Sequence, residues 1–411
     1  MIPPTTACSP GLRQRLPIYP SQMLIAMAMV SLGPLLDPMM KSLGIPLSRG
    51  GLLSAALYVG NVSGILVLNM LMAHVRSKRV LLAGIALQGT GLILAGAISR
   101  NLWSLCLTYM VVGFGGALLN TTCWMWLTTH VRQNAASAAL LMIMFFGLGM
   151  VAVPPILGAA IDHGASWRWI LVAEGCLALL LGFVYLWLPL LDVPGRQNVR
   201  PRHIRQVVAT DGRLLLGMMA AGLLYTGTEM TFNVWLPKFQ IDVFAVADTW
   251  ASLAVTLFWI GLVAGRMIMR PLSRRYRASR LLLVCSAVMA VFAVAVAFSP
   301  NQPTALVLAV GAGLGASASY GLIGSFATTF PGWQAAVASS LFILSGGVGS
   351  MAFPYMMGPL AAAAGFRTAV AVLAIPAVAY GLMSLLLRPR GTDAAVQAEA
   401  AARAEAAAPR P

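Results

Sequence analysis

The feature that most constrains the fold of this 411-residue chain is an apolar run that recurs along almost its whole length. Each run is about 20 residues long, and a helix of that length crosses the roughly 30 Å hydrocarbon core of a bilayer. Charged residues make up only 9% of the chain, whereas soluble domains carry about 25%. The sequence therefore predicts an all-α membrane protein and excludes a soluble globular fold.

We expect twelve membrane-spanning helices, one for each apolar run. The expected spans are residues 18–42, 49–72, 79–98, 102–127, 135–160, 167–189, 214–237, 249–270, 279–298, 304–328, 335–359 and 366–387. The first run is too long for a cleavable signal peptide and has no small-residue cleavage site after it. We therefore expect it to remain as the first span.

A polar, arginine-rich stretch interrupts the apolar pattern near the middle of the chain. Residues 191–213 contain five arginines together with Pro194, Gly195 and Pro201, residue types that interrupt helices. The predicted organisation is an N-terminal segment (1–17), a six-helix bundle (18–190), a basic linker (191–213), a second six-helix bundle (214–387) and a low-complexity tail (388–411).

The basic residues predict how the spans are oriented. The net charge is +16, which in a soluble chain would suggest a nucleic-acid partner. Here 18 basic residues fall in segments on the side of the termini, against six on the other side. Because cytoplasmic loops are enriched in Lys and Arg, this asymmetry predicts a multi-pass protein of the cell membrane with both termini cytoplasmic. It also explains the charge without nucleic acid.

The two halves of the chain resemble each other. Residues 135–158 match residues 335–358 at an offset of 200, including the pairs Pro154/Pro354 and Gly158/Gly358. A second window agrees at an offset of 201, and it contains the pairs Gly60/Gly261, Gly64/Gly265, Arg76/Arg277 and Arg79/Arg280. Each half holds six spans, an even number, so the halves run in the same direction. Parallel six-helix repeats are typical of one large class of secondary transporters.

With these features the chain resembles the major facilitator superfamily along its whole length. The basic loop from His74 to Arg79 lies where the family usually has the motif Gly-x-x-x-Asp-Arg-x-Gly-Arg-Arg. Met70 stands in place of the glycine and His74 in place of the aspartate, so only the basic end of the motif remains. The resemblance implies a gating role for Arg76 and Arg79 and, near the second copy, for Arg266.

Two stretches resemble the fucose-permease type of sugar transporter more narrowly. They are residues 113–122, Gly-Phe-Gly-Gly-Ala-Leu-Leu-Asn-Thr-Thr, and residues 225–237, Tyr-Thr-Gly-Thr-Glu-Met-Thr-Phe-Asn-Val-Trp-Leu-Pro. Those permeases place an acidic residue on span four, and Asn120 occupies that position here. The resemblance therefore implies a sugar-like substrate but no proton coupling at this position.

Carboxylates inside the membrane are costly and so indicate function. We expect Glu229 to carry proton coupling, because it falls near the middle of span seven with Tyr225 and Asn233 one turn before and after it. Asp37 on span one is the second candidate. The alternatives are a protonated core residue at Glu229 and a near-surface ion pair of Asp37 with Lys41.

Aromatic rings and amides on several spans predict a polar binding cavity. Such groups suit a sugar or another neutral polar solute, although core packing accounts for each residue alone. The predicted substrate-binding residues are Tyr58, Asn61, Asn120, Trp124, Tyr225, Asn233, Trp235 and Tyr320.

Motifs of other function classes do not occur in the sequence. It has no Walker sequence for ATP, no HExxH or Ser/His/Asp pattern, and no Cys/His spacing for a metal, so we expect neither an enzyme nor a cofactor. We expect a monomeric secondary transporter that takes up a small polar organic solute with protons by alternating access. The 23 methionines leave open the efflux of hydrophobic or cationic compounds. A membrane sensor or scaffold without transport is a further alternative.

Overall fold

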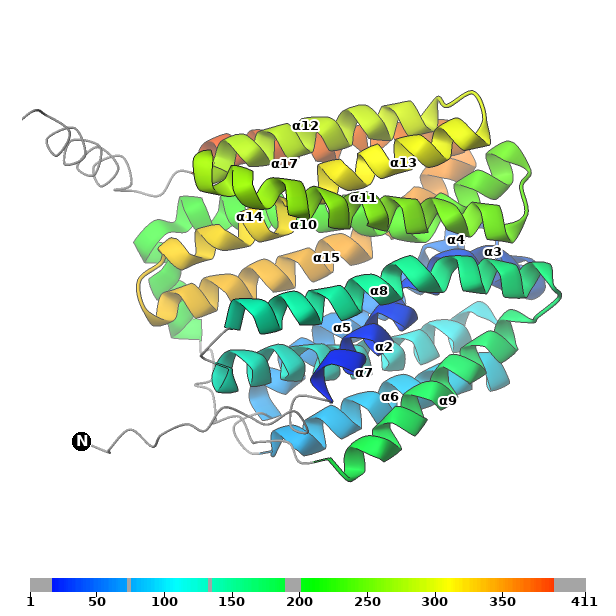
Figure 1. Ribbon diagram of the computed structural model, residues 1–411, viewed down its shortest axis with the longest axis horizontal. Helices are drawn as coiled ribbons and strands as arrows, with labels where there is room; N and C mark the ends of the chain where they lie inside the picture. The colour runs from blue at the N-terminus through cyan, green and yellow to red at the C-terminus, as the bar shows by residue number, and fades with distance from the viewer. Residues whose placement is uncertain (1–16, 72–74, 132–134, 189–200, 388–411) are drawn as a thin grey trace, which may run out of the picture.

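The computed structural model describes residues 17–71, 75–131, 135–188 and 201–387. In this part of the chain, twelve helices are long and apolar enough to cross a membrane, and no strand occurs. They form two bundles that lie side by side (Figure 1). The first bundle comprises α2 (Ile18–Val30), α3 (Leu32–Leu43), α4 (Leu47–Gly50), α5 (Leu52–Leu71), α6 (Ser77–Ile98), α7 (Leu102–His130), α8 (Ala135–Asp162) and α9 (Trp167–Leu186). The second comprises α10 (Pro201–Phe244), α11 (Asp248–Arg275), α12 (Ala278–Ala297), α13 (Gln302–Ala316), α14 (Ser319–Ser325), a 3-10 turn (Phe326–Thr329), α15 (Trp333–Ala364), α16 (Phe366–Val372) and α17 (Ala374–Leu386).

Equivalent residues begin equivalent helices in the two bundles. The Asn101 side chain accepts a hydrogen bond from the Ser104 N–H at 2.9 Å and so caps α7. Two hundred residues later, the Asn301 side chain accepts from the Thr304 N–H at 3.0 Å and caps α13. Each cap satisfies one of the N–H groups that the first turn of a helix leaves unpaired. The repeat predicted from the sequence is thus present in the local structure.

Glycines at equivalent positions of the two bundles make equivalent helix–helix contacts. A Cβ atom on Gly113 would collide with the Leu57 carbonyl of α5, and one on Gly313 would collide with the Phe258 carbonyl of α11. Small residues allow this close backbone approach inside a membrane, where packing rather than the hydrophobic effect holds helices together. The two six-helix repeats are therefore built by the same contacts, as predicted.

The second part of the predicted linker is helical. Helix α10 begins at Pro201 and is interrupted at Asp211, whose φ of −156° and ψ of 78° are not helical. The Asp211 carboxylate accepts a hydrogen bond from the Leu214 N–H at 3.1 Å, so it caps the segment that enters the membrane. Residues 191–200 of the linker lie outside the described residues.

Within the described residues, four spans are each divided into two α-helical segments. Span one changes from α2 to α3 at Ser31, and span ten changes from α13 to α14 at Ser317 and Ala318. Spans two and twelve are divided near their ends, at Gly51 and Leu373. A break in a membrane helix releases backbone carbonyl groups that need partners within the protein. Such breaks in transporters commonly mark binding sites.

The bundles contact each other most closely at one end, which we call the short-loop end. There the connections 44–46, 99–101, 163–166, 245–247, 298–301 and residue 365 join successive spans, on the right in Figure 1. A Cβ on Gly158 would lie 2.5 Å from the Asp248 carbonyl of the other bundle, and one on Gly358 would lie 2.7 Å from the Leu47 carbonyl. These two contacts are related by the repeat, because Gly158 and Gly358 are 200 residues apart and Leu47 and Asp248 are 201 residues apart.

Candidate functional site

Glu229 lies on α10 inside the protein, with 6% of its surface exposed. Its carboxyl lies beside Tyr225, one turn earlier on the same helix, and interacts electrostatically with Arg266 of α11. It also interacts with Tyr58 of α5, which belongs to the other bundle. The carboxyl is therefore placed between the halves, within the electrostatic influence of Arg266 and near the hydroxyl groups of Tyr225 and Tyr58.

The break in span ten holds the partners of Glu229 in position. The Tyr225 hydroxyl donates to the Ala316 carbonyl at 3.0 Å, and Arg266 Nε donates to the Ser317 carbonyl at 3.1 Å. Ser317 also packs directly against Gly265, where a side chain would collide with it. The carbonyl groups at the break thus orient both side chains that interact with Glu229.

Other tyrosines complete this cluster. The Tyr225 ring lies 5.6 Å from that of Tyr380 and 6.4 Å from that of Tyr320, measured between ring centres. Both tyrosines interact electrostatically with Glu229. Tyr320 is 39% exposed, whereas Tyr225 and Tyr380 are fully buried. We call Tyr58, Tyr225, Glu229, Arg266, Tyr320 and Tyr380 the Glu229 cluster.

A small cavity lies in the N-terminal half beside the Glu229 cluster. Its volume is about 20 Å³, which is enough for one water molecule. Its polar lining is Tyr58, Asn61 and Gln88, and its other lining residues are apolar or glycine. Gln88 Nε2 donates to the Leu24 carbonyl at 2.8 Å, but the buried Gln88 Oε1 atom has no partner. A neutral polar group could satisfy that oxygen.

Asn120 and Trp124 lie on α7 away from this cluster. The Asn120 side chain accepts a hydrogen bond from Gln22 at 3.4 Å, and Trp124 is half-buried. No hydrogen bond or ion pair in the described part of the chain joins either residue to Glu229. The predicted substrate-binding residues therefore do not all lie together in this conformation.

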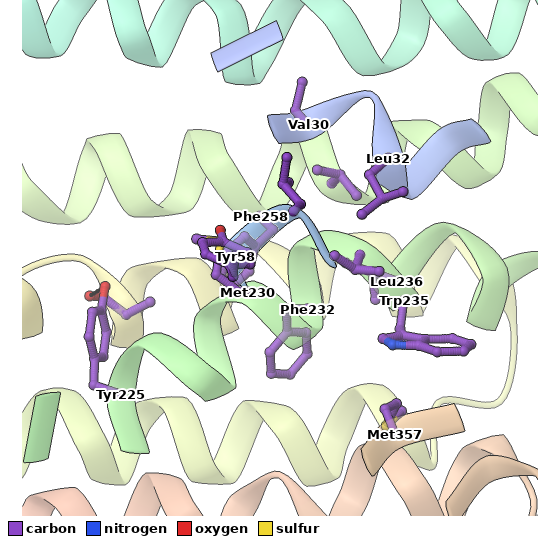
Figure 2. Close-up of a cluster of buried hydrophobic side chains, with 14 of the residues drawn as sticks. Val30, Leu32, Tyr58, Tyr225, Met230, Phe232, Trp235, Leu236, Phe258 and Met357 are labelled. Carbon is purple, nitrogen blue, oxygen red and sulfur yellow. Dashed lines mark hydrogen bonds between the residues drawn. The ribbon is translucent and has the colours of Figure 1, made fainter. Parts of the chain in front are cut away.

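Asn233 and Trp235 use their polar atoms in protein contacts. The Asn233 side chain donates to the Met29 carbonyl at 3.3 Å and accepts from Trp259 at 2.9 Å, so it joins the two halves. The Trp235 indole N–H donates to the Pro354 carbonyl at 2.8 Å. Figure 2 shows Trp235 well separated from Tyr225 along α10, with Met230 and Tyr58 between them. Trp235 is thus buried in the interior in this conformation, and its role in substrate binding stays a prediction.

Asp37 is held in an ion-pair network rather than standing free. Its two carboxylate oxygens lie 2.7 Å from the ammonium groups of Lys41 and of Lys238, and Lys238 also pairs with Asp242. The pair with Lys41 is the alternative that the sequence left open. The pair with Lys238 was not foreseen, and it links span one to span seven across the two halves.

The comparison with known families decides the class of the protein. The family model described as Major Facilitator Superfamily matches residues 18–250 and 218–409. The chain belongs to this superfamily. Such membership makes it a multi-pass membrane transporter.

Relatives within the superfamily are distant in sequence but match over most of the chain. "Protein TsgA homolog" of Buchnera aphidicola subsp. Baizongia pistaciae is 19% identical over 86% of this chain and 89% of its own length. The glucose/mannose transporter GlcP of Bacillus subtilis is 22% identical over 73% of this chain and 76% of its own length.

Solved superfamily structures share the fold. An inward-facing bacterial homologue of the human lysosomal transporter Spinster matches with a TM-score of 0.76 and 13% identity, over 91% of this chain and 96% of its own. The transporter FucP in an outward conformation matches with a TM-score of 0.62 and 16% identity, over 91% and 98%.

The residues expected from the superfamily's basic motif lie in two different places. Arg76 and Arg79 are exposed at the start of α6, at the end of the bundle opposite the short-loop end. Arg266 instead lies in the Glu229 cluster. The gating role of Arg76, Arg79 and Arg266 stays a prediction.

Proposed function

We propose that this superfamily member is a secondary active transporter that takes up a small polar organic solute, with proton coupling at Glu229. The observation that carries the proposal is the buried Glu229 carboxyl, which interacts with Arg266 and Tyr225 in its own half and with Tyr58 in the other. A proton on this carboxyl changes the charge balance with Arg266. Since the site lies between the halves, that change acts on their relative position.

Several groups around Glu229 favour a neutral polyol as the solute. Tyr58, Asn61 and the unpartnered oxygen of Gln88 offer hydrogen bonds to hydroxyl groups. Tyrosine rings give the flat apolar surfaces against which sugar rings pack. The name of the relative GlcP, a glucose/mannose transporter, points to the same class. We therefore propose hexoses as the first substrates to test.

Contacts at the short-loop end support alternating access. Span one meets span seven there through Asp37 and Lys238, and α8 meets α11 through Asp162 and Thr249. All of these are polar contacts or backbone contacts at glycine, which separate at lower cost than a large apolar interface. We propose that these contacts separate when the site opens to the outside of the cell. We also propose that both termini lie in the cytoplasm.

The decisive experiment compares wild type with Glu229→Gln in proteoliposomes, using radiolabelled glucose and mannose. The glutamine keeps the shape and hydrogen bonding of the side chain but cannot exchange a proton. We expect counterflow without a proton gradient to survive in Glu229→Gln and gradient-driven accumulation to be lost. Asp242→Asn, which removes a carboxylate outside the cluster, should retain both activities. Wild-type accumulation in Glu229→Gln would show that Glu229 is structural, and Asp37 would become the next candidate.

A ligand screen, followed by transport measurements in the same vesicles, distinguishes uptake from the alternative of efflux. Purified protein is first screened by thermal shift against sugars, carboxylates and cationic dyes, because a bound ligand raises the melting temperature of the folded state. A shift with dyes but not with sugars, followed by proton-driven dye export, would contradict the uptake proposal.

A further inference from the structure

A second carboxyl group lies deep in the N-terminal bundle and takes no part in the Glu229 cluster. Glu174 is on α9, seven residues after the first residue Trp167, which places it roughly 10 Å along the helix. It is 6% exposed and shares the buried face of α9 with Ile170, Leu171 and Ala178. The carboxyl therefore faces the interior of the bundle.

No cation neutralises Glu174. Within the described residues it forms no ion pair. The nearby Arg168 is engaged elsewhere, since its guanidinium donates to the Gly96 carbonyl at 3.1 Å and lies 4.4 Å from the centre of the Trp167 ring. Neither carboxyl oxygen of Glu174 has a hydrogen-bond partner in this conformation. An ionised carboxylate in such surroundings costs several kcal/mol, and a bound proton removes that cost.

The groups facing Glu174 are neutral. Ser31, at the junction of α2 and α3, turns its hydroxyl toward the carboxyl and lies within 3.5 Å of the Ala28 carbonyl. Tyr109 of α7 is the titratable group that interacts with Glu174. Helix α6, which packs along α9, contributes no charged side chain to it in the described part of the chain. Rotation of the Ser31 hydroxyl would supply one hydrogen bond to an ionised Glu174.

We infer that Glu174 is a second, exchangeable proton-binding site, loaded in this conformation and distinct from Glu229. Its neighbour Ser31 lies at the junction of α2 and α3 in span one. In α3, Gly33 and Asp37 contact span seven. Movement of α3 therefore changes the surroundings of Glu174 directly. Binding of this proton does not depend on the proposed transport function, whereas its use in coupling does.

Infrared spectroscopy of the purified protein in nanodiscs tests the inference without a substrate. A protonated carboxyl has a C=O stretching band that a carboxylate lacks. We expect wild type to show such a band at neutral pH that disappears at alkaline pH, and Glu174→Gln to lack it completely. Asp242→Asn is the matched control, because it removes a carboxyl that lies away from Glu174 and forms an ion pair with Lys238. Glu229→Gln should leave the Glu174 band in place, so a failure of the Glu229 proposal does not affect this result.

Two outcomes would overturn the inference. One is a wild-type spectrum that is identical to that of Glu174→Gln, which would mean that Glu174 is ionised. The other is a Glu174 band that persists at every pH at which the protein stays folded, which would mean a permanent structural proton. If Glu174→Gln does not fold, Ser31→Ala provides the second measurement. It should move the loss of the same band to higher pH, because it removes the hydroxyl that could donate to the ionised carboxylate, and an unchanged pH of loss would contradict the assignment.

Discussion

Asp162, the last residue of α8, accepts hydrogen bonds from both the backbone N–H of Thr249, at 2.9 Å, and the Thr249 hydroxyl. Its other oxygen accepts from the Asp248 N–H at 3.0 Å. Helix α11 of one half is thus capped by a carboxylate from the other half. Because a helix N-terminus favours negative charge, this contact holds the short-loop end closed.

We expect Asp162→Ala to shift the protein toward a conformation that is open at the short-loop end. Loss of an N-cap costs about 1–2 kcal/mol, which is roughly a five- to thirtyfold change in an equilibrium. The check is the labelling rate of Ser252→Cys, a position that is 1% exposed and packed against Gly158. Asp162→Asn keeps one acceptor oxygen but loses the charge and the second acceptor, so it should fall between wild type and Asp162→Ala. Equal labelling in both variants and in wild type would show that the cap does not control closure.

The ion pair of Asp37 with Lys238 should contribute more than the pair with Lys41. The Lys238 side chain is 11% exposed and that of Lys41 is 71% exposed. Removing one partner of a buried pair costs about 3–5 kcal/mol, and the remaining Lys41 reduces that cost here. Lys238→Met should therefore lower the melting temperature clearly.

Lys41→Met is the matched control, since exposed pairs contribute about 0–1 kcal/mol. The double variant Asp37→Asn with Lys238→Met should be more stable than the sum of the single effects predicts. It removes both buried charges, and the side chains that it leaves without a partner, Lys41 and Asp242, are 71% and 31% exposed. Equal melting temperatures for Lys238→Met and Lys41→Met would contradict a buried link between the halves.

Tyr225→Phe should destabilise the protein even in the absence of substrate. The variant leaves the buried Ala316 carbonyl, released by the break in span ten, without the hydroxyl that now donates to it at 3.0 Å. An unsatisfied buried acceptor costs about 1–3 kcal/mol. Thermal unfolding of the purified variant checks this, with Tyr276→Phe as control because Tyr276 is 47% exposed. Equal stabilities would mean that another group satisfies the carbonyl.

The charge asymmetry predicts where loops and ends lie. Reporter tags placed after Gly195 and at the C-terminus should both indicate cytoplasm, and a tag after Asn301 should indicate the outside. The physical reason is the excess of 18 basic residues over six on the side of the termini. Any other pattern of tag activity would contradict the proposed orientation.

The sequence by itself determined the spans, the repeat and the family. These properties are local: a run of about 20 apolar residues crosses a bilayer wherever it occurs, and equivalent residues such as Asn101 and Asn301 cap their helices through neighbours three residues away. The pairing of Glu229 with Tyr225 was predictable for the same reason, because both lie on one helix face, one turn apart.

Only the tertiary structure decided which faces of different helices meet. The spans are apolar on all sides, so the sequence carries little information on their rotation about their own axes. Rotation and crossing turn Arg266 toward Glu229 and Glu174 into the bundle, which the positions of these residues along the chain do not indicate. They also bring Asp37 to Lys238, about two hundred residues away in the chain. The carbonyl groups at the break in span ten accept hydrogen bonds from Tyr225 and Arg266, which lie on other helices.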